Sequence, residues 1–551
     1  MKPDLKCVVL TGLESSGKSS LFNLLTHSAT SDESNFRGSS VYCREKRLYK
    51  ASVRLIDTPG IRYKSDNMTT GLALSALAGS DIVLLVIRAT HALAEWETLR
   101  PLVKNHSKHR FAVVLTFRDK VTDGMGNIIS EFHRLTGAPV IALDVRRAGD
   151  TELQQLLELL NHVKTIDTEK VESRSAIPVL NITTLPPQRS WFEAKHLGPL
   201  VALLSLILLF ALPVWLSWHI SNLTQPLADR FLIQPAAMGL KDAPKLLQAV
   251  FTGSYGLLSL GIYSFIWAFP VVFFIGLSVA VTDDAGIKER IIYALDPWLR
   301  TAGLSGADLV PVLSGFGCNV VAVFQSRTCS HCTRKNCIST IAFGSACSYQ
   351  IGATLSLFSA AGHPGLFFPY LAILFFTACL HTRLWNRAGL QQQAIAAEEP
   401  GWLQWPRWRT VSWMLKNVVT QFLLQAMPLF LIICVAASLL NYFSVIDAIC
   451  AYLAPLAHAF NLPEPVIPGI IFSLLRKDGL MVLNQDGGTL IQSLSLTQLI
   501  LVIWLASTLM ACLVTILTIA REISWRFAAE VVSKQALSSL LVAALISLTL
   551  T

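Results

Sequence analysis

Residues Gly12–Ser19 (GLESSGKS) have the spacing of a phosphate-binding loop, Gly-x-x-x-x-Gly-Lys-Ser. The loop follows an apolar run, Cys7–Thr11, and opens a helical one, Leu21–Leu25. Glycines allow backbone N–H groups to face a phosphate, Lys18 adds a positive charge, and a serine hydroxyl can ligate Mg²⁺. The alternative is a chance match to the pattern. The residues that we expect to contact a nucleotide here are Gly12, Ser15, Ser16, Gly17, Lys18, Ser19 and Ser20.

Two further motifs stand at the ends of predicted strands. Asp57-Thr-Pro-Gly60 follows the strand expected at 51–56, where an acid can hold the Mg²⁺ shell and Gly60 N–H can meet a γ-phosphate. Thr116-Phe-Arg-Asp119 follows another strand, at the place where GTPases carry Asn/Thr-Lys-x-Asp. Thr116 and Asp119 therefore become candidate base-side residues, with Asp119 selecting guanine; the alternative for Asp119 is a solvated turn acid.

These motifs require a parallel sheet to position them. Apolar runs at Ile82–Ile87, Phe111–Leu115 and Val140–Leu143 alternate with helical stretches, and a further strand is expected at 40–43. We therefore predict a small-GTPase-like α/β domain over residues 1–165, with its last helix at about 150–163. A linker at 166–195, which contains three prolines, follows it.

The composition of the remaining chain indicates a membrane domain. The 551 residues are 52% hydrophobic, and the mean hydropathy of +0.51 is too high for an ordinary soluble protein. The net charge of +9 fits Lys and Arg in cytoplasmic loops, and no basic-aromatic pattern indicates nucleic-acid binding. The eleven cysteines are scattered, so disulfides are not expected.

We predict an all-α polytopic membrane domain over residues 196–551, with about eight or nine crossings of the lipid bilayer. The charged N-terminus passes directly into the first strand, so no cleavable targeting segment is expected, and the G domain should lie in the cytoplasm. The candidate spans are His196–Trp215, Leu257–Val281, Leu366–Leu384, Phe422–Phe443, Leu496–Leu517 and Leu537–Leu550, with interrupted apolar segments at 309–323, 338–358 and 466–483.

Two of the interrupted segments contain residues that break helices. Pro311–Val320 includes Gly315, Gly317 and Cys318, and Pro468-Gly469 precedes Arg476–Gly479. Broken backbone at membrane depth is tolerated where it is buried in protein or lines a cavity, as in transporters. A packing kink is the alternative for either segment alone, but two breaks in separate halves of the domain favour a functional arrangement.

Beside the first break lies a cluster of cysteines, Cys329-Ser-His331-Cys332, followed by Cys337. Three thiols and an imidazole could bind Zn²⁺ or Fe²⁺, or relay a soft cation, because thiolates favour such metals. They could equally be small residues in a reduced cytoplasmic loop. The spacing leaves both interpretations open.

Taken together, the motifs resemble the bacterial ferrous-iron transporter B (FeoB) family over both parts of the chain. Asn35–Val41 resembles that family's switch, which places Ser40 at the Mg²⁺-sensing threonine. The membrane-part segments that resemble family motifs are Thr282–Ile287, Gly315–Val320 with Ser326–Thr328 (first gate), Ser345–Ser348, Lys477–Gly479, Cys512–Thr515 and Arg521–Trp525. The two gate motifs would lie at about 305–358 and 464–484.

The resemblance implies a GTP-regulated transporter in the bacterial inner membrane that imports a divalent metal ion, most simply Fe²⁺. Ser19, Ser40 and Asp57 would hold Mg²⁺, and Cys318, Cys347 and Cys512 would line the ion path. GTP hydrolysis would drive or gate transport, and a second copy of the chain or a small accessory protein is open as a partner. The alternative is a membrane-anchored regulatory GTPase whose gate-like domain senses metal without transporting it.

Several positions depart from the family pattern. Leu13-Glu14-Ser15 replace Asn-Pro-Asn in the phosphate-binding loop, which leaves potassium stimulation open. The interval before the first span is too short for the family's helical regulatory domain. Gln350 replaces an arginine, and no proline follows Val320, so the gate is a variant one.

Overall fold

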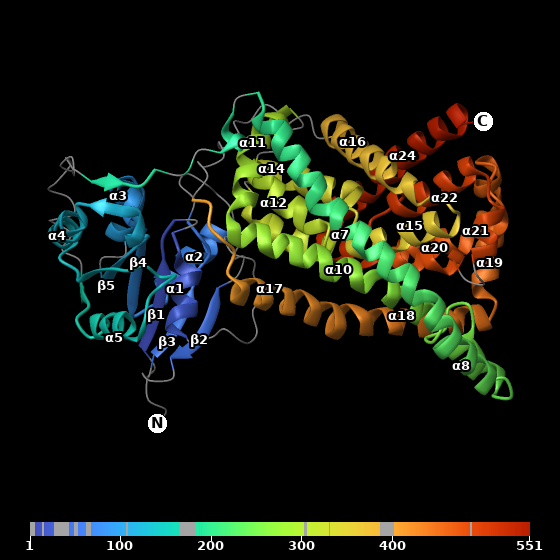
Figure 1. Ribbon diagram of the computed structural model, residues 1–551, viewed down its shortest axis with the longest axis horizontal. Helices are drawn as coiled ribbons and strands as arrows, with labels where there is room; N and C mark the ends of the chain where they lie inside the picture. The colour runs from blue at the N-terminus through green and yellow to red at the C-terminus, as the bar shows by residue number, and fades with distance from the viewer. Residues whose placement is uncertain are drawn as a thin grey trace. The chain divides into compact units, whose positions relative to one another are not determined.

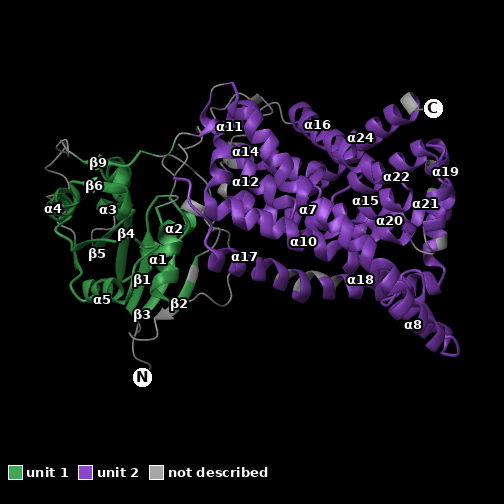
Figure 2. Cartoon of the chain, viewed as in Figure 1, with its two compact units in different colours: residues 1–188 green, residues 189–551 purple. Residues whose placement is uncertain are grey.

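The computed structural model describes residues 6–13, 16–26, 43–48, 53–61, 68–105, 108–165, 182–186, 188, 190–194, 196–301, 306–329, 331–385, 402–484 and 488–550. The chain divides into two compact units, Met1–Gln188 (unit 1) and Arg189–Thr551 (unit 2), which Figure 2 shows in different colours. Each unit has its own core and is described by itself.

Unit 1 is built on a mixed sheet in the order β2-β3-β1-β4-β5-β7, with β8 paired to β5 (Figure 1). β2 and β8 run antiparallel to their neighbours, and the other pairs are parallel. A separate two-stranded sheet joins β6 and β9. The strands are β1 (Lys6–Thr11), β2 (Arg44–Leu48), β3 (Val53–Asp57), β4 (Ile82–Arg88), β5 (Arg110–Thr116), β6 (Val121–Asp123), β7 (Val140–Ala142), β8 (Lys164–Thr165) and β9 (Thr183–Thr184).

Helices cover both faces of this sheet. Buried side chains of α2, α3 and α4 pack on one face, and those of α1 and α5 pack on the other. β4 is buried along almost its whole length because a parallel sheet covered on both sides exposes neither face of its central strands. The helices are α1 (Lys18–Leu25), α2 (Met68–Ala78), α3 (Ala92–Asn105), α4 (Met125–Thr136) and α5 (Asp150–Leu159), with short 3₁₀ turns η1 (Ala89–His91) and η2 (Arg118–Lys120).

The predicted α/β domain is therefore confirmed. Residues 40–42 of the strand expected at 40–43 lie outside the described residues, and the structure has a strand, β2, that begins at Arg44, directly after Cys43. Its register is set by antiparallel pairing to β3, where Arg44 lies opposite Asp57. This pairing is a tertiary contact, so the local residue pattern could not determine the strand's start.

Unit 2 is helical. Its first half comprises η3 (Trp191–Glu193), α7 (Gly198–Ala228), η4 (Asp229–Ile233), α8 (Gln234–Gly239), α9 (Lys245–Thr252), α10 (Leu260–Ala285), α11 (Ile287–Thr301), α12 (Gly306–Gly315), α13 (Asn319–Gln325), η5 (Ser326–Thr328), α14 (His331–Gly344), α15 (Ser348–Ala360), η6 (Pro364–Leu366) and α16 (Phe367–Trp385). Its second half comprises α17 (Trp408–Gln421), η8 (Phe422–Ala426), α18 (Met427–Tyr442), α19 (Val445–Ala459), η9 (Glu464–Val466), α20 (Ile467–Leu475), η10 (Lys477–Asn484), α21 (Thr489–Ser493), α22 (Leu496–Thr508), α23 (Leu513–Glu522) and α24 (Trp525–Leu550).

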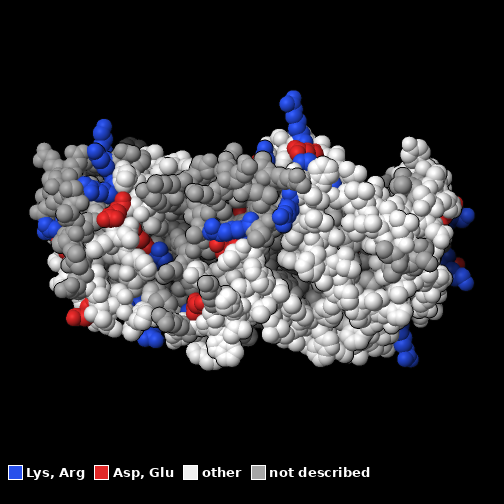
Figure 3. Space-filling view, turned by 90° about the horizontal axis from the view of Figure 1, so that it is seen from above, with Lys and Arg blue, Asp and Glu red and all other residues white. Residues whose placement is uncertain are grey.

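Five helical stretches among the described residues are long and apolar enough to cross a membrane: Gly198–Gly239, Leu260–Ala285, Pro364–Trp385, Leu496–Glu522 and Trp525–Leu548. Many leucines on α7, α16 and α24 are exposed, as a lipid-facing surface requires. Figure 3 shows a broad face of unit 2, in the right half of the view, with few charged side chains. Together these features describe a multi-pass membrane protein.

Five of the six predicted spans overlap these helices with shifted ends, and the sixth, Phe422–Phe443, overlaps a shorter apolar helix. The segment expected at Phe422–Phe443 begins with a π-helical turn, η8, that joins α17 to α18 without a break. The span expected at Leu537–Leu550 is the second half of the longer helix α24. Shorter apolar helices lie at Phe430–Tyr442 and Glu464–Leu475, and the total of eight or nine crossings stays a prediction.

Candidate functional site

The phosphate-binding loop joins β1 to α1. Gly12 has φ +159°, and a Cβ there would lie 2.2 Å from Val86 O, so only glycine fits against β4. Gly17 precedes α1 in the left-handed region at φ +90°. Ser16 is buried between them, and Ser19 and Ser20 follow Lys18 on the first turn of α1, whereas Ser15 lies outside the described residues.

The Lys18 ammonium lies over this loop and is almost fully buried. Its Nζ lies 3.2 Å from Gly12 O, 2.5 Å from Leu13 O and 3.4 Å from Ser16 Oγ. All three acceptors are neutral oxygens. A bound phosphate would supply charged oxygens in place of neutral carbonyls, and hydrogen bonds to charged groups are stronger.

The second motif lies beside the loop. Asp57 ends β3 and is fully buried, and Thr58 Oγ1 donates to Leu10 O at 2.7 Å. Ile61 N donates to Gly12 O at 3.0 Å, so Gly60 stands immediately before a residue bonded to the phosphate-binding loop. The structure therefore brings Asp57 and Gly60 to the same edge of the sheet as Lys18, while Ser40 lies outside the described residues.

Thr116 supports the loop from β5. Its hydroxyl lies 2.7 Å from Ser16 O and 3.2 Å from Ile87 O, and the side chain is 1% exposed. A Cβ placed at Gly17 would lie 3.4 Å from Thr116 Cγ2. Thr116 therefore stabilises the phosphate-binding loop through the hydrogen bond to Ser16 O.

We expect Thr116→Val to weaken GTP binding by roughly 5- to 30-fold, because a buried carbonyl left without its donor costs about 1–2 kcal/mol. Thr116→Ser keeps the hydroxyl and should bind nearly normally. Titration of both variants with a fluorescent GTP analogue measures the effect. Weakened binding in Thr116→Ser with normal binding in Thr116→Val would assign the contribution of Thr116 to its methyl group instead of its hydroxyl.

Asp119 lies in η2, after Phe117, which takes the left-handed conformation at φ +57°. The Asp119 carboxylate is partly exposed and pairs with Lys120 Nζ at 2.8 Å. Arg118 N lies 3.5 Å from Leu143 O, which brings the loop after β7 next to this turn. An exposed carboxylate here is available to a base.

One charged pair in unit 1 was missed at the sequence level. Glu95 on α3 is 2% exposed, accepts Arg88 N at 2.9 Å and forms an ion pair with the Arg88 side chain at the end of β4. Burial raises the pKa of Glu95. The positive charges of Arg88 and Lys18 lower that pKa, but by less, so it stays above its ordinary value. Glu95 therefore lies within electrostatic range of Lys18, and only the fold brings the two together.

In unit 2, the three cysteines predicted to line an ion path occupy equivalent positions. Cys318 precedes α13, Cys347 precedes α15 and Cys512 precedes α23, each as the N-cap residue. The thiols also lie within electrostatic range of one another. Three helix N-termini, whose first N–H groups have no partner within their own helix, therefore lie beside these thiols, and such N-termini stabilise negative charge.

Close backbone contacts join the first two breaks. Ser348 N and Ser348 Oγ both donate to Gly317 O, at 3.3 and 2.8 Å. A Cβ at Gly315 would lie 2.6 Å from Ser345 Cβ, so glycine is required for this approach. Ser345 Oγ in turn donates to Val312 O at 3.1 Å. Two of the predicted interrupted segments, 309–323 and 338–358, are thus packed against each other.

Lys477, in the second predicted gate, joins the break before Cys512. Its side chain is 4% exposed, and Nζ donates to Ala506 O at 2.9 Å, Ser507 O at 2.8 Å and Met510 O at 2.6 Å. Ala506 O and Ser507 O belong to the last turn of α22, where carbonyls have no partner within the helix, and Met510 follows the end of α22 at Thr508. Lys477 therefore caps the helix that ends before Cys512.

Beside Lys477 is a buried ion pair. Arg476 Nε and Nη2 donate to the two carboxylate oxygens of Asp478 at 3.0 and 2.8 Å, and Ser264 Oγ donates to the same carboxylate at 2.9 Å. The guanidinium also lies 4.6 Å from the Tyr349 ring centroid. A buried charge needs such partners, so this set holds η10 against α10 and α15.

A third set of charges joins the far ends of two broken helices. Glu522, at the end of α23, accepts both Arg327 Nε at 2.7 Å and Arg334 Nη2 at 3.2 Å. Arg327 belongs to η5, directly after α13, and α13 packs against α23. Two parallel helices that start at Cys318 and Cys512 are therefore fastened together at their other ends.

Two cysteines of the predicted cluster have described side chains. Cys329 and Cys337 lie close together, and their third neighbour is Asp308, which the sequence pattern did not indicate. Cys332 lies in the first turn of α14, and its side chain is outside what the structure describes.

Comparisons with known proteins agree with this two-part organisation. Residues 7–117 match the family described as 50S ribosome-binding GTPase, and residues 265–361 match the Gate family, described as nucleoside recognition. Fe(2+) transporter FeoB of Campylobacter jejuni is 27% identical over 192 residues, which covers 33% of this chain and 30% of that protein. GTPase Der of Mycoplasma capricolum is 26% identical over 216 residues, covering 36% of this chain and 48% of that protein.

Among solved structures, NFeoB from S. thermophilus bound to GDP.AlF4- and K+ matches with 22% identity and a TM-score of 0.25, covering 32% of this chain and 66% of that one. The chain thus spans less than two thirds of these relatives. The fold and the matched families define a GTPase-type G domain joined to a helical membrane gate domain. The chain is a FeoB-like protein.

Proposed function

We propose that this protein is a GTP-regulated transporter that imports a divalent metal ion, with Fe²⁺ as the first candidate. The observation that carries the proposal is the convergence of Cys318, Cys347 and Cys512, each at the start of a helix that follows a break. Thiolates select borderline-soft cations over Mg²⁺ and Ca²⁺. Relatives named Fe(2+) transporter FeoB support the choice of iron.

Unit 1 would bind GTP and Mg²⁺ on its phosphate-binding loop. A serine hydroxyl from Ser19 and a buried carboxylate from Asp57 form a donor set of the kind that Mg²⁺ accepts. Mg²⁺ would neutralise phosphate charge, while Lys18 binds the phosphates and Asp119 selects the base. GTP hydrolysis would then remove the contacts that hold the loop after Asp57. Under this proposal unit 1 faces the cytoplasm of a bacterial cell and unit 2 spans the inner membrane.

Uptake by purified protein in liposomes tests the proposal. We expect Cys318→Ser to reduce uptake of radiolabelled Fe²⁺ at least 10-fold, because a hard hydroxyl replaces a polarisable sulfur of similar size. Cys379→Ser on α16 is the matched control and should transport normally. The GTPase rate of both variants should stay at the wild-type value.

The same liposome assay distinguishes the proposed transporter from the alternative function. A membrane-anchored GTPase that senses metal would change its GTPase rate with Fe²⁺ yet accumulate none inside the liposome. Normal uptake by Cys318→Ser would remove this thiol from the ion path.

We expect Asp119→Asn to shift nucleotide preference from GTP toward xanthosine triphosphate. The carboxylate accepts hydrogen bonds from the guanine edge, whereas an amide presents a donor in its place. Competition between the two nucleotides for a fluorescent analogue measures the shift. If the preference does not change, Asp119 is a turn residue that pairs with Lys120 and has no base contact.

A further inference from the structure

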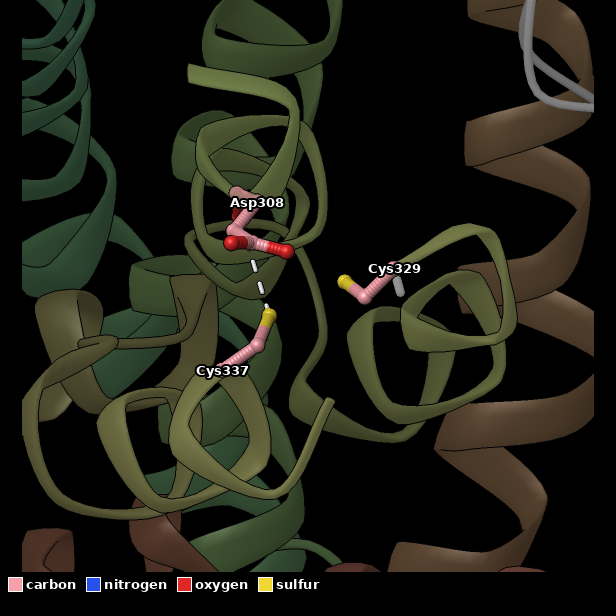
Figure 4. A group of neighbouring side chains, drawn as sticks. All are labelled: Asp308, Cys329 and Cys337. Carbon is pink, nitrogen blue, oxygen red and sulfur yellow. Dashed lines mark hydrogen bonds between the residues drawn. The ribbon is translucent and has the colours of Figure 1, made fainter. Parts of the chain in front are cut away.

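A carboxylate and two thiols converge in unit 2, apart from the three helix-capping cysteines. Asp308 comes from α12, Cys329 follows η5 and Cys337 comes from α14. A carboxylate oxygen and the two sulfur atoms all lie within 4.8 Å of one another. Figure 4 shows the three side chains pointing into one common space.

This space is closed to solvent. All three side chains are at most 2% exposed, and Val312, Ile338 and Ile341 pack around the cysteines. Thr333 Oγ1 donates to Asp308 Oδ1 at 2.9 Å, and Cys337 Sγ lies 3.6 Å from the backbone carbonyl of Asp308. Burying a carboxylate in apolar surroundings is costly, and a bound cation offsets that cost.

We propose that Asp308, Cys329 and Cys337 bind a divalent cation of the Zn²⁺ type. Two sulfur ligands and one carboxylate oxygen suit Zn²⁺ and exclude the hard cations Mg²⁺ and Ca²⁺. Tetrahedral bonds of about 2.0–2.3 Å place ligand atoms roughly 3.5–3.8 Å apart. Side-chain rotations that close each separation by about 1 Å are therefore sufficient, and a fourth position stays open for water or another ligand.

This site lies on two helices, α12 and α14, that end at the breaks of the predicted first gate. Along the axis of α12, Asp308 lies about 10 Å before Gly315, the last residue of the helix, at a rise of 1.5 Å per residue. The break at Cys318 follows Gly315. Cys337 stands the same distance before Gly344, the end of α14, which leads to Cys347. A cation here fastens two gate helices about two turns away from their breaks. The site is thus a structural or regulatory one, distinct from the proposed ion path.

Cobalt spectroscopy on the purified full-length protein in lipid nanodiscs tests this proposal. The protein is stripped of metal with a chelator under reducing, anaerobic conditions and then titrated with Co²⁺, whose thiolate complexes have a sulfur-to-cobalt absorption band. The site variant is Asp308→Asn with Cys329→Ser and Cys337→Ser. The matched control carries Cys318→Ser, Cys347→Ser and Cys512→Ser.

We expect the control to keep a band that corresponds to one Co²⁺ per chain and disappears when Zn²⁺ is added. The site variant should lose that band, and Zn²⁺ should raise the melting temperature of the control but not of the site variant. Asp308→Asn alone, which preserves volume, should weaken Zn²⁺ binding at least 10-fold and serves if the triple variant does not fold.

Three results would overturn the assignment: a band retained by the site variant, no band in the control, or unchanged Zn²⁺ affinity in Asp308→Asn. A disulfide between Cys329 and Cys337 in anaerobically purified protein, detected by mass spectrometry, would identify a redox pair instead. A protein that keeps the cobalt band but does not take up Fe²⁺ would contradict the transport proposal and leave the metal-site proposal intact. Failure of one proposal can therefore be distinguished from failure of the other.

Discussion

Lys477→Met should lower the melting temperature of unit 2 sharply and abolish metal uptake. The substitution removes an ammonium that donates to Ala506 O and Ser507 O in the last turn of α22 and to Met510 O just after it. Each buried carbonyl left without a donor costs about 1–3 kcal/mol, so the total loss is several kcal/mol. The helix end before Cys512 would rearrange, and with it the thiol that the helix break positions. Thermal unfolding in nanodiscs and liposome uptake measure the two effects.

Lys534→Met provides the control for Lys477→Met. Lys534 pairs with Glu530 one turn earlier on α24, and the Glu530 side chain is largely exposed. Pairs of this kind contribute about 0.3–0.5 kcal/mol. The control should therefore unfold and transport almost as the wild type does. If Lys477→Met behaves in the same way, Lys477 does not stabilise the break.

Lys18→Ala is expected to weaken GTP binding by about 100-fold or more and to stop metal uptake. Lys18 contributes charged hydrogen bonds to phosphate, each of about 1.5–3 kcal/mol, and about 1.4 kcal/mol corresponds to a tenfold change in affinity. The loop itself should stay formed, because Thr116 and Ile61 also hold it. Fluorescent-nucleotide titration and liposome uptake measure the two losses.

Two controls accompany Lys18→Ala. Lys104→Ala removes an exposed charge at the end of α3 and should bind GTP normally. The melting temperature of unit 2 should be the same in both variants, since neither residue belongs to it. Uptake that continues in Lys18→Ala would show that transport does not need the nucleotide, and it would contradict GTP regulation.

Much of the G domain could be predicted from local patterns. The continuous apolar run of β4 indicates a strand that is buried on both faces, and the phosphate-binding loop and Asp57 each follow such a strand. The Asp57 and Lys18 side chains reach one edge because parallel strands end on the same side of the sheet. Glu95 was missed because a charged residue on an amphipathic helix gives no local sign of burial.

In the membrane domain, the break at Gly315 to Cys318 is encoded locally by its glycines, whereas Pro468 and Gly469 lie within α20 and the helix there ends later, at Leu475. The break before Cys512 has no glycine or proline: residues 509–512 read Leu-Met-Ala-Cys. It is stabilised by Lys477 and by Gln535, whose Oε1 accepts Ala511 N at 3.2 Å. Asp308 was missed for the same reason, since its proximity to Cys329 and Cys337 is a tertiary contact.

The ion pair between Glu522 and Arg327 holds the C-terminal ends of α13 and α23 together, so that each helix can rotate about this point. The thiol end of α23 lies about 15 Å from this point at 1.5 Å per residue. Swinging the helix by 10° would carry Cys512 through roughly 2–3 Å, which exceeds the length of a metal–sulfur bond of about 2.3 Å. Under the proposed function, a rotation of this size would be enough to release a cation held between Cys318 and Cys512.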